Sequence, residues 1–351
     1  MKRWMETRQV LERLDGVLRE GTRAALATVI HVRGSAYRHE GAKLLVTADG
    51  QGMGNVSGGC LEADVREVAH QVMRTGVAER RTYRGGANEV AAWDLGVGCD
   101  GEVEILIEPA GAAHAQELAL MDREEPFVTI TRLGDGVSTG ELARWTLTAG
   151  DAAGWIGDGR SQLVEHDGNT LFVDVLLPPP RLLIVSAGDD AVHLARIAHD
   201  VGFRVVVADR RAALLTRERF PHRVGLVETD ASRLLERIVL DAGSFAVVMT
   251  HNFNDDTNYL RALLSSPVRY IGMLGPRQRT ERMLAALRTE LEPAGETIDE
   301  SRVYGPVGLD IGTDGAEQVA LSVIAEILAV RGARHPVSLR DRMAPIHADA
   351  E

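Results

Sequence analysis

The stretch Arg181-Leu-Leu-Ile-Val-Ser-Ala-Gly-Asp-Asp-Ala191 decides the fold, because an apolar strand in it runs directly into a small turn that leads to a helix. A second apolar strand is predicted at 203–208 and ends in Asp209, about twenty residues after the turn. This spacing is typical of the G-x-G-x-x-G/A fingerprint of dinucleotide-binding units, in which an acidic residue after the second strand faces a ribose hydroxyl. The stretch therefore predicts a Rossmann-like unit.

The same turn carries candidate ligand residues and two departures from the fingerprint. Gly188, Asp189 and Asp209 are the residues expected to face a bound cofactor. Ser186 stands at the first glycine position, which normally makes the tight turn. Asp189 and Asp190 bring negative charge to the place of a pyrophosphate. These departures leave the fold prediction intact and count against tight binding of NAD(P).

Strands and helices continue to alternate through this half of the chain. Further apolar strands are predicted at 245–250 and 269–273. Helices are predicted at 191–201, 231–240, 257–264, 277–291 and 316–330. Because crossover helices connect parallel strands, the pattern predicts an α/β fold with a doubly wound parallel sheet.

The first half of the chain mixes helices and strands without this alternation. Helices are predicted around 10–18, 61–73 and 112–121, and strands at 24–32, 44–47, 103–108, 127–132, 142–148 and 171–177. A run of three prolines follows and is typical of a stiff linker. With 351 residues, the chain is longer than one hydrophobic core usually supports. We therefore predict an α+β domain at 1–177, a linker at 178–180, a Rossmann-like domain at 181–335 and a tail at 336–351.

Composition argues against several classes of protein. The net charge is −12 and no lysine and arginine cluster with interleaved aromatics is present, which disfavours nucleic-acid binding. The charged start Met1-Lys-Arg-Trp-Met-Glu-Thr-Arg8 lacks the apolar core of a signal peptide, and no apolar run approaches the length of a membrane span. The two cysteines form neither a disulfide framework nor a Cys-x-x-Cys site. We therefore expect a cytoplasmic protein, without membrane or nucleic-acid partners, whose thiols stay reduced.

Both cysteines lie in glycine-rich turns. In Asn55-Val-Ser-Gly-Gly-Cys-Leu-Glu62, two glycines place Cys60 in the expected first turn of a helix, where unpaired backbone N–H groups lower a thiol pKa and favour anions. The alternative is a buried Cys60 that packs as a small apolar side chain. Cys99 lies in Gly96-Val-Gly-Cys-Asp-Gly101, so the two thiols either share a site or resemble each other by coincidence.

Cations beside glycine-rich turns are candidate anion-binding groups. Arg33, Arg38 and Lys43 lie in one turn-rich loop, where they either hold an anion together or remain exposed charges. Gly275 and Arg277 lie at a predicted strand-to-helix turn, where a helix N-terminus favours anions.

Two further loops are predicted at the same edge of the sheet. His251 follows the strand at 245–250 and is a candidate proton donor and acceptor near neutral pH. Asp255 or Asp256 either orients His251, holds a cation, or caps the next helix. The segment 305–312 is too rich in glycine for a strand and is predicted as a loop facing the same crevice.

These motifs together resemble the XdhC/CoxI family of xanthine dehydrogenase accessory proteins over nearly the whole chain. In the first half the resemblance rests on Gly34-Ser35 with Arg38 and Gly41, on Val56-Ser-Gly-Gly-Cys-Leu-Glu62 and on Gly98-Cys99. In the second half it rests on Ala187-Gly-Asp-Asp-Ala191, Asp209-Arg210, Thr250-His251, Tyr270-Ile-Gly-Met-Leu-Gly275 and Pro306-Val-Gly-Leu-Asp-Ile-Gly312. The Ser-Gly-Gly-Cys and Pro-Val-Gly-Leu-Asp-Ile-Gly strings are specific in combination.

The resemblance implies a molybdenum-cofactor maturation factor. Such a protein holds the molybdopterin cofactor as cargo, supports replacement of an oxo ligand by sulfido with a cysteine desulfurase, and transfers the cofactor to an apo molybdenum hydroxylase. The resemblance implies a homodimer and a chaperone more than a turnover enzyme. Its reactive residues would be Cys60, Cys99 and His251, with Cys60 as the metal contact because molybdenum has affinity for sulfur. The cofactor-binding residues would be Arg38, Ser57, Gly58, Gly59, Glu62, Gly188, Asp189, Asp209, Gly275, Arg277, Gly308 and Asp310.

Three positions depart from the family pattern. Asp100 follows Cys99 where the family usually has glycine, Ser186 replaces the first fingerprint glycine, and Asn252 follows His251 where aspartate is usual. The first change adds charge beside a proposed thiol site, and the third removes a carboxylate from the crevice.

Two other functions remain open from the sequence. One is an NAD(P)-dependent oxidoreductase with His251 as acid–base group, which Asp209 favours and Ser186 opposes. The other is a thiol-dependent redox or sulfur-transfer enzyme built on Cys60 and Cys99, which would need neither pterin nor nucleotide.

Overall fold

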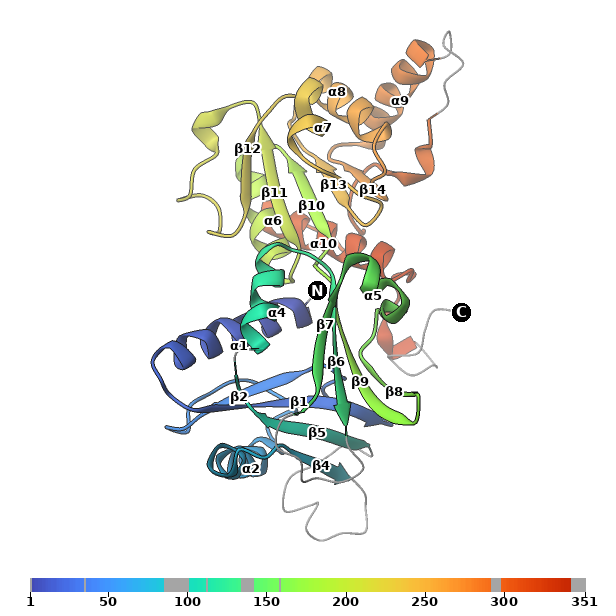
Figure 1. The fold of residues 1–351 in the computed structure, drawn as a ribbon. Coiled ribbons are helices and arrows are strands. Elements are labelled where there is room, and N and C mark those ends of the chain that lie inside the picture. Colours follow the sequence, from blue (N-terminus) through green and yellow to red (C-terminus); the bar gives the residue numbers. More distant parts are fainter. Residues whose placement is uncertain are drawn as a thin grey trace. The chain divides into compact units, whose positions relative to one another are not determined.

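The chain divides into two compact units, Met1–Pro178 and Pro179–Glu351, with the boundary inside the proline run. The computed structural model describes residues 2–34, 36–84, 101–111, 113–133, 142–157, 159–291 and 298–341. Figure 1 shows the helices and strands of each unit. Within these ranges, no helix combines the length and the apolar character needed to cross a membrane.

The first unit contains a five-stranded antiparallel sheet of order β3-β2-β1-β5-β4. Its strands are β1 (Ala24–Arg33), β2 (Lys43–Thr47), β3 (Gly52–Gly54), β4 (Glu79–Arg84) and β5 (Glu102–Pro109). Alternate residues of β1 contact different helices, as the two-residue period of a strand requires. Ala25 and Ala27 share a core with α2 (Glu62–Thr75), whereas Leu26 shares a core with α1 (Lys2–Arg19).

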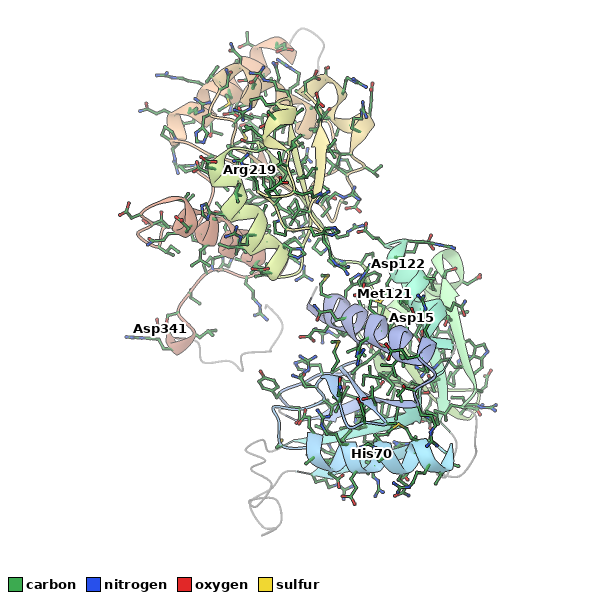
Figure 2. All side chains as sticks on the ribbon, turned by 90° about the vertical axis from the view of Figure 1, so that its left-hand side faces the viewer. Asp15, His70, Met121, Asp122, Arg219 and Asp341 are labelled. Atoms are coloured by element: carbon green, nitrogen blue, oxygen red, sulfur yellow. The ribbon has the colours of Figure 1, made fainter. Side chains whose placement is uncertain are left out.

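A second antiparallel sheet completes the first unit, in the order β7-β6-β9-β8. Its elements are α4 (Ala113–Asp122), β6 (Phe127–Leu133), β7 (Arg144–Thr148), α5 (Ala149–Ile156), β8 (Gln162–His166) and β9 (Asn169–Leu176). Arg8 ties α1 to the end of α4. It donates to the Met121 carbonyl at 3.1 Å and pairs with Asp122, two residues labelled in Figure 2.

Charged side chains are buried inside the first unit. Lys43 donates to the Asp174 carboxylate at 2.7 Å, and both side chains are only about 5% exposed. Arg3 and Ser161 donate to the other oxygen of Asp174, at 3.3 and 2.6 Å. Burial alone would raise the pKa of Asp174, but Lys43, Arg3 and Ser161 lower it to about 2. Lys43 is therefore committed to a buried ion pair.

The second unit contains a six-stranded parallel sheet of order β12-β11-β10-β13-β14-β15. Its strands are β10 (Arg181–Val185), β11 (Arg204–Asp209), β12 (Gly225–Glu228), β13 (Phe245–Val248), β14 (Tyr270–Met273) and β15 (Val303–Tyr304). Read along the chain, this is the Rossmann order 3-2-1-4-5-6. The predicted doubly wound parallel sheet is confirmed, and its topological switch point lies between β10 and β13.

Helices cover both faces of this sheet (Figure 1). The helices are α6 (Asp189–Asp200), α7 (Leu234–Arg237), α8 (Phe253–Leu264), α9 (Arg277–Leu291) and α10 (Ala316–Arg331). α6 packs against α10, while α7, α8 and α9 share a buried core with Leu183, Val185 and Val248 of the sheet. Alternate residues of β10 face opposite sides of the sheet, so α6 and α10 lie on one face and α7, α8 and α9 on the other.

The structure corrects several predicted elements. The predicted helix at 231–240 is a 3₁₀ turn at Ala231–Arg233 followed by the short α7, and α8 begins at Phe253, not at 257. Strands β4 and β12 are absent from the sequence prediction. Most β4 side chains are partly or fully exposed, so this edge strand lacks the apolar pattern that marks a strand.

Candidate functional site

A crevice lies at the carboxyl edge of the parallel strands, beside the switch point. The segments after β10, β11 and β13 surround a cavity of about 220 Å³. Open α/β sheets bind ligands at this edge. The cavity is lined by Ser186, Ala208, Asp209, Arg210, Arg211, Thr250, His251, Asn252, Asp255 and Tyr259.

Ser186 keeps the backbone conformation of the glycine that it replaces. Its φ is +148°, in the region that favours glycine, and its side chain is buried. The Ser186 hydroxyl accepts a hydrogen bond from the Gly188 N–H at 3.0 Å, which fixes the start of α6. The loss of the first glycine therefore changes the chemistry of the turn more than its shape.

Asp209 lies where a fingerprint acid is expected, but its carboxylate is already hydrogen-bonded. One oxygen accepts from the Ala187 N–H at 2.7 Å and from Arg211 at 2.8 Å. The other accepts from the backbone and side chain of Arg211, at 2.8 and 2.9 Å. Burial raises the pKa of Asp209, but the bonds from Arg211 and Ala187 outweigh it and lower the pKa. Asp209 thus holds the turn and the Arg211 side chain, and its predicted contact with a ribose stays a prediction.

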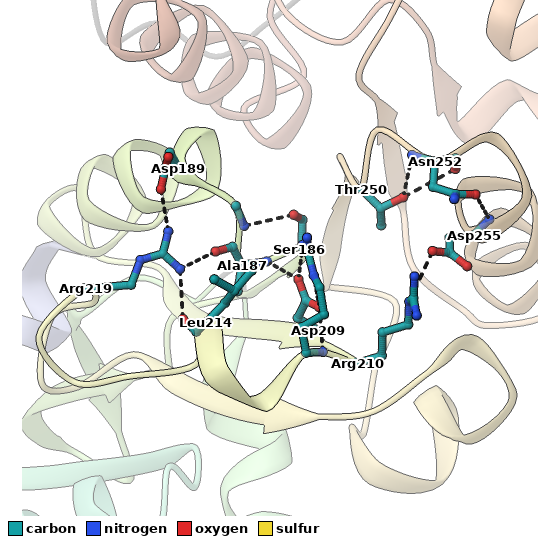
Figure 3. Close-up of polar contacts among 12 residues, drawn as sticks. Ser186, Ala187, Asp189, Asp209, Arg210, Leu214, Arg219, Thr250, Asn252 and Asp255 are labelled. Atoms are coloured by element: carbon teal, nitrogen blue, oxygen red, sulfur yellow. Dashed lines mark hydrogen bonds and ion pairs between the residues drawn. The ribbon is translucent and has the colours of Figure 1, made fainter.

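The N-terminus of α6 carries two carboxylates that already have basic partners. Asp189 pairs with Arg219 at 2.6 Å, and Arg219 also donates to the Ala187 and Leu214 carbonyls, as Figure 3 shows. Asp190 lies 3.1 Å from Nε2 of His251, a residue whose φ is +62°. Negative charge therefore occupies the place where a dinucleotide presents its pyrophosphate.

In the segment after β13, the acidic residues have other roles than those predicted from the sequence. Asn252 caps α8 by accepting from the N–H groups of Asn254 and Asp255, at 3.0 and 3.1 Å, so no aspartate caps this helix. Asp256 is buried. It accepts from Thr250 and from Arg279.

Asp255 is the other acid of this segment. It pairs with Arg210 at 3.3 Å, as the dashed line in Figure 3 shows, and both residues line the cavity. Among the described residues, the carboxylate that pairs with His251 is that of Asp190 and not that of Asp255 or Asp256.

The remaining predicted residues of the second unit lie on loops at the same edge. Gly275 has φ +122°, and Arg277 is exposed at the first position of α9. Gly308 has φ +104°, and a Cβ there would lie 2.6 Å from the Ser322 hydroxyl, so packing alone requires this glycine. Asp310 is exposed in the same loop. The 220 Å³ cavity itself is lined by neither of these loops.

In the first unit, Ser57 and Glu62 fix the turn before α2. Glu62 accepts from the N–H groups of Val56 and Ser57 and from the Ser57 hydroxyl. That hydroxyl accepts from the Gly59 and Leu61 N–H groups, at 3.0 and 3.1 Å. Burial raises the pKa of Glu62, but the hydrogen bonds from Ser57 outweigh it and lower the pKa. Both residues therefore shape the turn before any ligand binds.

Cys60 lies two residues before α2, so the prediction that places it in the first turn of the helix is wrong. Its side chain is half-buried and is a free thiol. Gly59 has φ +114°, and the exposed Tyr37 ring lies near Gly58, 3.6 Å from where a Cβ would be. Among the residues that the structure describes, no group of three or more histidine, cysteine or acidic side chains could hold a metal ion. The metal contact of Cys60 stays a prediction.

The predicted cation cluster at 33–43 is not assembled. Arg38 pairs with Glu6, and Lys43 is buried against Asp174, so neither faces an anion together with Arg33. Cys99 and Asp100 lie outside the described residues, as does Ser35. The sequence analysis also missed Arg211, which donates to Asp209 two residues before it, and Arg219, which donates to the Ala187 carbonyl 32 residues before it.

The fold defines a two-unit protein whose second unit has the Rossmann fold. Residues 182–327 match the XdhC Rossmann domain, and residues 17–84 match the XdhC and CoxI family. The chain belongs to the XdhC/CoxI family, which confirms the resemblance found in the sequence.

Three relatives illustrate the similarity. A probable xanthine dehydrogenase subunit of Bacillus subtilis (strain 168) is 30% identical and aligns over 91% of this chain and 96% of its own length. The molybdenum cofactor insertion chaperone PaoD of Escherichia coli (strain K12) is 25% identical over 92% of this chain and 88% of its own. The crystal structure of a xanthine dehydrogenase from Bacillus halodurans, 29% identical, superposes with a TM-score of 0.76 over 95% of this chain and 98% of that chain.

Proposed function

We propose that this protein holds the molybdenum cofactor and inserts it into a molybdenum hydroxylase of the xanthine dehydrogenase type. The observation that carries the proposal is similarity to a molybdenum cofactor insertion chaperone over 92% of this chain, which includes both units. The proposal extends to a cysteine desulfurase as the partner for sulfuration and to a homodimer as the working form.

The turn at Ser57–Glu62 supports the proposal as one place of contact. Its backbone is held by Glu62 and Ser57, so a ligand meets a shape that is already formed. Gly59 leaves open space beside the half-buried Cys60 thiol. Tyr37 adds an exposed aromatic face, which suits a pterin ring. A thiolate in such a turn is a suitable transient partner for molybdenum.

The test uses purified protein incubated under anaerobic conditions with released molybdenum cofactor. Retention is measured by mass and by pterin fluorescence, with NAD(P)H titrated in parallel. We expect retained pterin. Loss of pterin together with micromolar binding of NAD(P)H would instead support an oxidoreductase.

Cys60→Ala is the variant that tests the thiol. We expect a severalfold loss of cofactor retention or sulfuration for Cys60→Ala, and a smaller loss for Cys99→Ala, which removes the other predicted thiol. Thermal unfolding of each variant separates a lost contact from a lost fold. Wild-type behaviour of both variants in activation of the target enzyme would refute the thiol role.

A further inference from the structure

A second, larger cavity adjoins the crevice on the side of β11 and β12. Its volume is about 740 Å³, within the range of small-molecule sites. Arg210, Asp255 and Tyr259 line both this cavity and the smaller one. The larger cavity follows α8 from Asp255 to Ser265, a length of about 15 Å at the rise of an α-helix. The two cavities therefore adjoin at this shared wall, and we refer to them together as the groove.

The larger cavity has an apolar wall and a polar rim. Tyr259, Leu264 and Leu287 supply apolar surface, and Tyr259 and Leu287 are almost fully buried. Asp230 and Asn258 supply hydrogen-bonding groups on the rim. A flat ring with polar edges fits such a surface, because its faces contact the apolar wall while its edges reach the rim.

The hydrogen bonds of Asp230 and Asn258 leave defined groups for a ligand. Asp230 accepts from Ser232 and Arg233 through Oδ1 only, so in the described part of the chain Oδ2 has no donor. Asn258 accepts from Arg261 at 2.7 Å through its carbonyl oxygen, which leaves its amide N–H groups to donate. The rim thus offers one acceptor and one donor, which suit the exocyclic amine and an adjacent ring acceptor of a nucleobase.

We propose that this groove binds a nucleotide with an amino-bearing base, the base in the 740 Å³ cavity against Asp230 and Asn258 and the phosphate near Arg210. The Arg210–Asp255 pair lies between the two cavities, at 3.3 Å, and the Arg210 side chain is 60% exposed. An exposed ion pair contributes little to stability, so a phosphate can replace Asp255 as the partner of Arg210 with little loss of free energy. The planar guanidinium of Arg210 then binds the phosphate through two N–H groups.

The same geometry distinguishes a nucleotide from a complete dinucleotide. In the Rossmann arrangement the pyrophosphate of NAD lies on the turn before the first helix. Here Asp189 and Asp190 occupy that position. The groove therefore binds a nucleoside diphosphate more tightly than NAD. This inference does not rest on the proposed function, since nucleotide binding and pterin retention are measured separately.

Isothermal titration of the full-length protein with ADP, CDP, GDP, UDP and NAD tests the proposal. We expect a Kd below about 1 mM for at least one amino-bearing nucleotide, and weaker binding of UDP, which has no exocyclic amine. The ADP, CDP and GDP arms identify the base. Absence of binding at about 1 mM, equal binding of UDP, or tighter binding of NAD than of ADP would overturn the proposal.

Asp230→Asn is the decisive variant because it keeps the oxygen that caps the 3₁₀ turn and replaces only the free acceptor with an amide donor. We expect its affinity to fall about tenfold, as for loss of one hydrogen bond to a charged group. Asp200→Asn makes the same charge change at an exposed position at the end of α6 and serves as the control. Unchanged affinity of Asp230→Asn, with an unchanged unfolding temperature, would contradict the assignment of the base.

Discussion

The two units use the same kinds of ion pair in opposite surroundings. In the first unit, Lys43 and Asp174 are both about 5% exposed and meet at 2.7 Å. In the second unit, Arg210 and Asp255 are 60% and 29% exposed and meet at 3.3 Å. Breaking a buried pair leaves a charge without solvent and costs much stability, whereas water solvates the charges of a broken exposed pair. The first pair therefore fixes a fold, and the second is suited to exchange its partner for a ligand.

Removing one member of the buried pair is expected to lower the free energy of unfolding more than any other change proposed for these pairs. Lys43→Met leaves the Asp174 carboxylate buried with only Arg3 and Ser161 as partners. We expect the free energy of unfolding to fall by about 3 kcal/mol. Urea unfolding measures the change. A loss below about 1 kcal/mol would mean that Arg3 and water replace Lys43, and the contrast between the two units would then fail.

The sequence predicted the second unit better than the first for a physical reason. The Rossmann sheet is built from consecutive strand and helix segments, so the sequence pattern that predicts it is local. The turn at Ser186 could be recognised from the residues around it even though the first glycine is missing. The partner of Lys43 lies 131 residues away on another strand. No local pattern distinguishes such a buried lysine from an exposed loop charge, which explains why both alternatives for Lys43, an anion-binding group and an exposed charge, are wrong.

In the candidate site too, local patterns were predictable from the sequence and contacts between side chains were not. The edge loops were predictable because parallel strands place their carboxyl ends together. The engagement of Asp209 by Arg211 was not, because the sequence shows an acid followed by two arginines and does not show which one folds back. The groove along α8 was missed because its walls come from α8, α9 and the segments that follow β11 and β12, which lie far apart in the sequence.

Lowering the pH tests the buried pair through a smaller expected loss of stability. The pKa of Asp174 is about 2 in the folded protein against an ordinary 3.8, so its ionised form stabilises the fold at neutral pH. A depressed carboxyl pKa gives stability that is fully present above the unfolded value and is lost as pH falls through the folded value. We expect Asp174 to account for about 2 kcal/mol of lost stability between about pH 4 and pH 2.

A double variant isolates this contribution from the other carboxylates. Lys43→Met with Asp174→Leu removes both charges, so its stability should fall less steeply than that of the wild type over the same pH range. Urea unfolding at several pH values gives both curves. Parallel curves would show that Asp174 titrates alike in the folded and unfolded chains.

The exposed pair gives the smallest expected effect on stability. Arg210→Met removes a guanidinium that is mostly in water and leaves Asp255 accessible to solvent, so no buried charge is stranded. We expect the free energy of unfolding to change by less than about 1 kcal/mol. Urea unfolding of Arg210→Met beside Lys43→Met compares the two pairs directly. A loss of about 3 kcal/mol for Arg210→Met would show that the pair holds the β11 and α8 ends together, and a residue with that structural role could not leave Asp255 for a phosphate.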